Sequence, residues 1–168
     1  GLYWGLFNLV ERPNAAFAAT YRGGEKEDYD ALNSGRAKDG DTNAYRTLMN
    51  LAESGVSSNT KYLEIQNWLD VSNLIDYMLT NYFGANADWP SHNWYAARKR
   101  EAGAGYMFLS WDAERIFESV SANRVGADSN NSPGRVFNKL RENAEFRLRV
   151  ADHVHRHFFN NGLLTSAP

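Results

Sequence analysis

The sequence contains no cysteine, so both a structural disulfide and a thiolate metal site are excluded. No apolar run approaches the roughly 18 residues that a transmembrane helix needs, and we therefore expect no insertion into a membrane. Acidic and basic residues are nearly balanced, with 20 Asp and Glu against 18 Lys and Arg. The formal net charge of −2 provides no electrostatic reason to expect a nucleic acid or an anionic membrane surface as a partner.

Apolar residues are present in sufficient number for a folded core. Hydrophobic residues make up 43% of the 168 positions, which is typical of one globular domain and excludes a disordered chain. The chain begins with Gly1 and leads directly into the strand-like stretch YWGLFNLV. We therefore expect that an upstream part is missing, and a signal peptide in that part remains an open alternative.

Helical spacing of apolar residues and capping residues predict six helices. They are expected over 14–21, 41–54, 59–69 and 71–83, from Ser132 onward, and after Asn143. An aromatic-rich strand is expected over 3–11, an exposed loop around one short strand over 22–41, and a long surface loop over 119–132. The fold class predicted from this balance is α+β, mostly helical with a small antiparallel sheet.

The stretch 83–114 holds the polar residues that are best arranged for chemistry. Residues 92–98 and 106–111 are rich in aromatic and aliphatic side chains and predict two strands, joined by a glycine-containing hairpin connection. Antiparallel pairing would bring Asn93 close to Asp112, with Asp88 just upstream. Their oxygen atoms are the ligands that Mg²⁺ prefers.

Asp88 and Asn93 have the D-x-x-x-x-N spacing of a protein kinase catalytic loop, in which the aspartate orients the substrate hydroxyl and the asparagine binds Mg²⁺. Two kinase features are absent. Asn86-Ala87 replaces the His-Arg pair, and Asp112 is followed by Ala-Glu instead of Phe-Gly. Taken alone, the spacing favours a simpler interpretation, in which Asp88 and Asn93 form turns and Asp112 caps a strand.

Longer motifs point to a family. The segments GLYWGLFNLVERP, LDVSNLIDYMLTNYFGANADWPSHNWYAAR, YMFLSWDAE and EFRLRVADHVHRHFFNNGLLTSAP occur in this order and span nearly the whole chain. Together they resemble the CotH family of spore-coat-type atypical protein kinases. The combination DW-x-x-x-N-W-Y followed by F-x-x-WD-x-E is the most specific part of the resemblance.

The resemblance implies a protein-kinase-like large lobe over residues 1–168, with ATP and Mg²⁺ (or Mn²⁺) as cofactors. It implies a catalytic role for Asp88 and metal binding by Asp112, Asn93 and Glu114. Two nucleotide contacts complete the expected site, namely Tyr106 against the adenine and Glu11 at the passage between the lobes.

The family also implies an upstream small lobe with a lysine that holds ATP. No lysine precedes Lys26, so the domain is expected to be truncated at its N-terminus and its activity without that lobe is in question. The expected activity is transfer of the ATP γ-phosphate to Ser or Thr of a protein substrate, outside the cell or in the bacterial cell envelope. The alternative is a catalytically silent, secreted adhesion or binding module on the same scaffold.

Two further patterns bear on function. His153 and His157 are spaced i, i+4 on a predicted helix and form half of a zinc site, but no matching acidic third ligand is evident in the sequence. Trp89 and Trp94 flank the Asp88 motif and are candidates for an exposed aromatic frame around the active site. For most aromatic residues of this chain, including Tyr106, the core is the default position.

Overall fold

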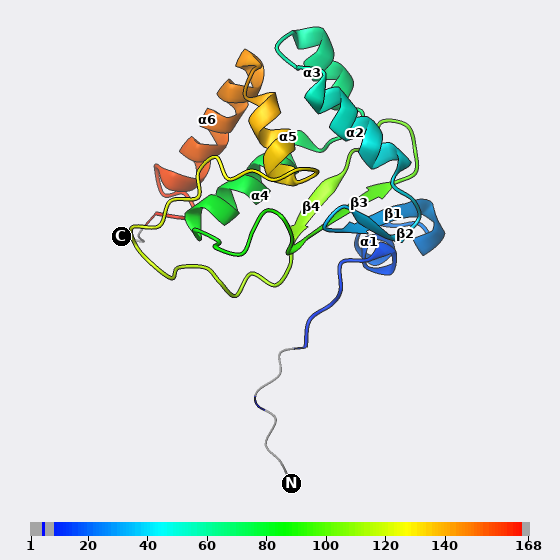
Figure 1. Cartoon of the computed structure of the whole chain (residues 1–168), viewed down its shortest axis with the longest axis horizontal. Coiled ribbons are helices and arrows are strands. Elements are labelled where there is room, and N and C mark those ends of the chain that lie inside the picture. Colours follow the sequence, from blue (N-terminus) through cyan, green and yellow to red (C-terminus); the bar gives the residue numbers. More distant parts are fainter. Residues whose placement is uncertain (1–4, 6–8, 166–168) are drawn as a thin grey trace.

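The computed structural model describes Gly5 and residues 9–165. Within this part of the chain there are six α-helices, one short 3₁₀ helix and four strands: α1 Ala15–Arg22, η1 Lys26–Asp28, β1 Tyr29–Asn33, β2 Arg36–Asp39, α2 Asn43–Glu53, α3 Asn59–Ile65, α4 Val71–Phe83, β3 Trp94–Lys99, β4 Met107–Ser110, α5 Pro133–Leu140 and α6 Ala144–Phe158 (Figure 1). The α+β class is confirmed. The strand expected over 3–11 lies largely outside the described residues, and residues 9–11 belong to no strand.

Three helices begin directly after the capping residues from which their starts were predicted. Asp70, Ser132 and Asn143 each occupy an N-cap position and accept a hydrogen bond from a backbone N–H in the first turn. Such caps satisfy donors that a helix start would otherwise leave without a partner. The segment 119–132 contains no helix or strand, which agrees with the long loop predicted there. None of the helices in the described residues is long and apolar enough to cross a bilayer.

The sheet is larger than the sequence indicated. Its strand order is β2-β1-β3-β4 and every neighbouring pair is antiparallel. The segment 22–41, expected to be a loop around one short strand, contributes both β1 and β2, and β1 lies inside the sheet. Its Asp30 is buried and accepts hydrogen bonds from Arg100 Nε at 2.7 Å and the Asp41 backbone N–H at 2.9 Å. This pairing explains how a charged stretch forms a central strand.

The two faces of the sheet pack against different layers. On one face, small residues of α1 (Ala15 and Ala18) contact Tyr29, Ala31 and Ala97. On the other face, Leu32 and Phe108 belong to the main core, which also contains apolar side chains of α2 to α6. Figure 1 shows α2, α3, α5 and α6 on the side of the strands away from α1, with α4 beside β4. Because both faces of β1 are covered, its sequence lacks the alternation of a half-exposed strand.

The edge strand β4 is fastened to α4 by one asparagine. Asn73 Nδ2 donates to the Phe108 carbonyl at 3.2 Å, and the Phe108 backbone N–H donates to Asn73 Oδ1 at 2.6 Å. A side-chain amide thus replaces the missing neighbouring strand at this edge. The contact places β4, which leads to Asp112, beside α4, which leads to Asp88.

Candidate functional site

Two tryptophans hold the loop that carries Asp88. Trp89 is buried and its Nε1 donates to the Tyr77 hydroxyl at 2.7 Å, while the buried Trp94 donates from Nε1 to the Pro90 carbonyl at 3.0 Å. The hypothesis that Trp89 and Trp94 form an exposed frame around the site is therefore wrong. Each indole places its apolar surface in the core and uses its single donor to fix the loop.

A relay of asparagine amides fixes the backbone of Asp88 to α4. Asn81 Nδ2 donates to the Tyr77 carbonyl, and Asn86 Nδ2 donates to Asn81 Oδ1, both at 2.9 Å. Asn86 Oδ1 in turn accepts from the Asp88 backbone N–H at 3.2 Å. Both asparagines are buried. In the sequence, Asn86 is recognisable only as a departure from the kinase pattern, because its partner Asn81 lies in the preceding helix.

Replacing Asn86 by alanine is expected to destabilise the domain. The change leaves Asn81 Oδ1 and the Asp88 backbone N–H without their partner, which costs about 1–3 kcal/mol for a buried group. Urea unfolding followed by circular dichroism measures this loss. Asn50→Ala, at an exposed position of α2, is the matched control and should change the unfolding free energy by less than about 0.5 kcal/mol. Equal effects of the two substitutions would contradict the relay.

The side chains of Asp88 and Asn93 are in direct contact. Asn93 Nδ2 donates to Asp88 Oδ2 at 3.0 Å and to the Asp88 backbone carbonyl at 3.1 Å. His92, which is not among the predicted site residues, places Nε2 2.7 Å from Asp88 Oδ1. The side chain of Asp88 is 33% exposed. Two neighbours thus orient the carboxylate of Asp88, and it is still accessible from the solvent.

Asp112 follows β4 at the same end of the hairpin. The β3–β4 ladder ends with the pair Trp94 and Ser110, so Asn93 and Asp112 lie one and two residues beyond it. Both have a left-handed backbone, with φ of 63° at Asn93 and 51° at Asp112. Asparagine and aspartate tolerate this conformation better than other residues with a side chain. Asp112 is exposed, so its carboxylate is not turned into the core.

Glu11, Asp112 and Glu114 line one pocket of about 380 Å³. Glu11 reaches it from the N-terminal segment, and its Oε2 accepts a hydrogen bond from the Tyr21 hydroxyl of α1 at 2.5 Å. Three of the predicted site residues therefore share a pocket, while Asp88 and Asn93 form their own hydrogen-bonded pair. Within the described residues, the acidic members of the predicted site do not bring three ligand atoms within 4.8 Å of one another.

Tyr106 lies away from these groups. It has 0% exposure, packs edge-on against Tyr45 with ring centroids 5.4 Å apart, and exchanges backbone hydrogen bonds with Trp68 and Asp70. It precedes β4, whereas Asp112 follows it. A side chain with no exposed surface offers no face to an adenine ring, so its location agrees with the core position that is the default for aromatic residues.

The fold and the site define an α+β protein in which an Asp–Asn loop and an acidic strand end lie at the same end of one hairpin. The chain matches the family model described as CotH kinase protein over residues 1–161, so it belongs to that family. The resemblance seen in the sequence is thereby confirmed. Neither the curated proteins nor the solved structures provided a match.

Proposed function

We propose that this chain carries the catalytic loop of an atypical protein kinase that transfers the γ-phosphate of ATP to a Ser or Thr hydroxyl of a protein. Membership of a kinase family supports phosphoryl transfer in general. The observation that carries the proposal is the contact between Asp88 and Asn93, with two hydrogen bonds of 3.0 and 3.1 Å. This contact joins the two residues of the D-x-x-x-x-N spacing at the end of the hairpin that leads to Asp112.

In this proposal Asp88 orients the attacking hydroxyl and accepts its proton. A carboxylate held near a hydroxyl contributes by positioning and by proton transfer, and both need a fixed, accessible oxygen. Asn93 contacts one of the carboxylate oxygens and His92 contacts the other. Asn93 uses Nδ2 for that contact, so Oδ1 is the atom that it would offer to a cation.

Oxygen donors make the site suitable for Mg²⁺ or Mn²⁺. Asp112, Asn93 and Glu114 offer carboxylate and amide oxygens, which these hard cations prefer. The bound cation would neutralise charge on the phosphates of ATP. The pocket also supports the need for a divalent cation. Its three carboxylates (Glu11, Asp112 and Glu114) would repel a triphosphate if no such cation were bound.

We further propose that the positively charged side chain that contacts the ATP phosphates belongs to a small lobe upstream of Gly1. A kinase site needs a lysine against the phosphates, and the first lysine of this chain, Lys26, lies in the exposed 3₁₀ helix η1. Residues 1–168 would then form the large lobe of one kinase-like domain and would not turn over substrate alone. We also propose a bacterial protein that acts in the spore coat or cell envelope, outside the cytoplasm.

Calorimetric titration with ATP tests the proposal on the protein that includes the upstream sequence. Binding heat is expected with ATP and Mg²⁺ together and not with ATP plus EDTA. Incubation with [γ-³²P]ATP and Mg²⁺ should label the protein itself or an added protein on Ser or Thr. The absence of both binding heat and labelling would instead identify a silent adhesion or binding module on the same scaffold.

A further inference from the structure

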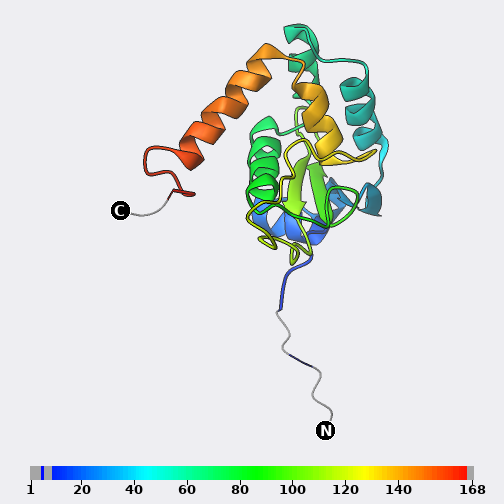
Figure 2. The same cartoon turned by 60° about the vertical axis from the view of Figure 1, so that its left-hand side comes forward.

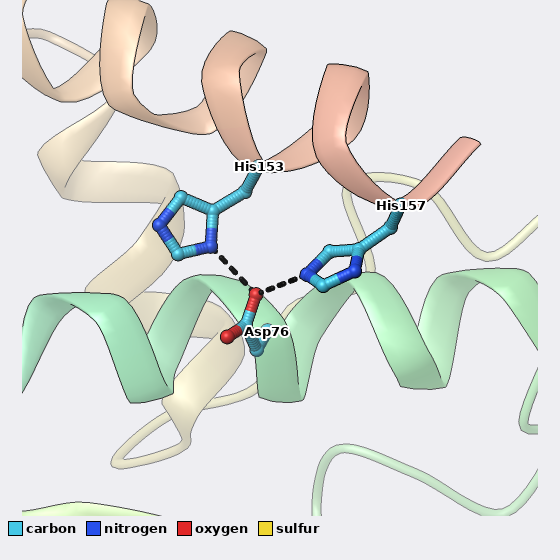
Figure 3. A group of neighbouring side chains, drawn as sticks. All are labelled: Asp76, His153 and His157. Carbon is cyan, nitrogen blue, oxygen red and sulfur yellow. Dashed lines mark hydrogen bonds and ion pairs between the residues drawn. The ribbon is translucent and has the colours of Figure 1, made fainter. Parts of the chain in front are cut away.

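A second group of ligand-type side chains joins α4 to α6, away from the Asp88 loop. Asp76 of α4 faces His153 and His157, which lie one turn apart on α6 (Figure 3). His153 Nδ1 is 2.6 Å and His157 Nε2 is 3.0 Å from the same Asp76 Oδ1 atom. In the part of the chain that the structure describes, it is the one set of three His, Asp or Glu groups whose ligand atoms lie within 4.8 Å of one another.

We propose that Asp76, His153 and His157 bind a Zn²⁺ ion that ties the last helix to α4. Two imidazole nitrogens and one carboxylate oxygen form a typical ligand set for zinc, whereas Mg²⁺ prefers oxygen ligands alone. The proposal does not depend on the proposed kinase activity, because it uses none of the residues assigned to that site.

Asp76 provides the acidic third side chain that was not evident in the sequence. It precedes His153 by 77 positions, and only the packing of α4 against α6 brings the two together. The i, i+4 spacing places both histidines on one face of α6, but the spacing alone does not specify what that face packs against.

The geometry suits a site that is formed before the metal arrives. Zn–N and Zn–O bonds of about 2.0–2.2 Å place neighbouring ligand atoms somewhat more than 3 Å apart in a tetrahedral site. The present separations of 2.6 and 3.0 Å are those of hydrogen bonds to a shared oxygen. A small rotation of the Asp76 carboxylate, whose side chain is 46% exposed, would open the space, while His153 at 6% exposure is held by its surroundings.

The hydrogen-bond contacts of the group involve the same atoms that would bind a cation. Partial burial acts to raise the pKa of Asp76, but the hydrogen bonds from His153 and His157 hold it below its usual value. A histidine ring can offer either of its two nitrogens to a metal, because the tautomer decides which nitrogen carries the proton. The exposed side of the group leaves room for water as a further ligand.

A metal here would strengthen a helix contact that is otherwise incomplete. An apolar pocket of about 440 Å³ lies between α4, α5 and α6, with Leu79, Phe83, Val150, Val154 and Phe158 among its lining residues. Figure 2 shows α6 at the periphery of the domain, extending away from α5. Three ligands shared by two helices would fix the position of α6 where the apolar contact leaves a gap.

The test is a titration of the tag-free chain with ZnCl₂ at pH 7.5, followed by calorimetry, with Co²⁺ absorption as a second readout of tetrahedral coordination. One Zn²⁺ per chain is expected, with affinity lowered at least tenfold in Asp76→Asn and in His157→Gln. Both side chains are partly exposed, so these variants should fold, and circular dichroism checks that they do. A thousandfold excess of Mg²⁺ should not displace the metal.

His155→Gln and Asp152→Asn are the matched controls, because both residues are exposed positions of the same helix. They should bind zinc as the unmodified chain does. At zinc concentrations 100-fold above Kd, the thermal midpoint of the unmodified chain should rise by about 5–10 °C. Zinc affinity equal in the unmodified chain and in His157→Gln, or lost equally in His155→Gln, would overturn the proposal.

Discussion

Replacing Asp88 by asparagine is expected to lower the rate of phosphoryl transfer by about 10²- to 10⁴-fold, the range over which a positioned acid–base group contributes. Asparagine preserves the shape of the side chain but cannot accept the proton of the attacking hydroxyl. Initial rates with [γ-³²P]ATP, measured on the protein that includes the proposed upstream small lobe, determine the effect. Since the Asp88 side chain is one-third exposed, its replacement should leave the fold intact.

The different expected effects on kcat and on the KM for ATP distinguish a role at the substrate hydroxyl from a role in nucleotide binding. Asp88 is assigned to the hydroxyl and not to the nucleotide, so kcat should fall while the KM for ATP changes little. Asp152→Asn removes an exposed carboxylate on α6 and should retain the full rate. If Asp88→Asn kept wild-type turnover, the role assigned to the Asp88 loop would be wrong.

Replacing Asp112 by asparagine is expected to impair the nucleotide complex as well as the rate, with kcat/KM reduced by about 10²-fold or more. The substitution removes the negative charge of Asp112, and the attraction of that charge is what would hold a divalent cation at this position. Asparagine suits this position as a test because the backbone of Asp112 is left-handed, with φ of 51°. Alanine would add backbone strain of about 1–2 kcal/mol and confuse the result.

Calorimetry separates this variant from the first. Asp88→Asn should bind Mg²⁺-ATP with nearly unchanged heat, whereas Asp112→Asn should lose most of the heat and recover part of it at high Mg²⁺ concentration. Glu114→Gln, in the same pocket, is expected to show a smaller loss. Unchanged Mg²⁺-ATP binding by Asp112→Asn would remove Asp112 from the metal site.

Local signals in the sequence were sufficient for much of the fold. Asp70 and Asn143 mark helix starts through hydrogen bonds that they make within their own first turn. The strand pair on either side of the segment 99–105 was predictable because a glycine-containing connection and two aromatic strands are near in sequence. The proximity of Asp88 and Asn93 follows in the same way, since only a short loop separates them.

Contacts between distant segments were not predictable. β1 carries charge and looks like a loop, yet it lies inside the sheet because α1 covers one face and Arg100 neutralises Asp30. The relay through Asn86 and the burial of Trp89 both depend on where α4 lies beside the loop. A hydrogen bond to a partner in another element leaves no periodic mark in the sequence.

The sequence by itself thus determined the family, the helices and the spacing of the Asp–Asn loop, because each is encoded in short motifs and local hydrogen bonding. Only the tertiary structure decided that Glu11 shares a pocket with Asp112, that Tyr106 belongs to the core, and that Asp76 meets the histidines of α6. These three outcomes depend on how helices and strands pack, and packing is set by the burial of whole surfaces rather than by any single motif.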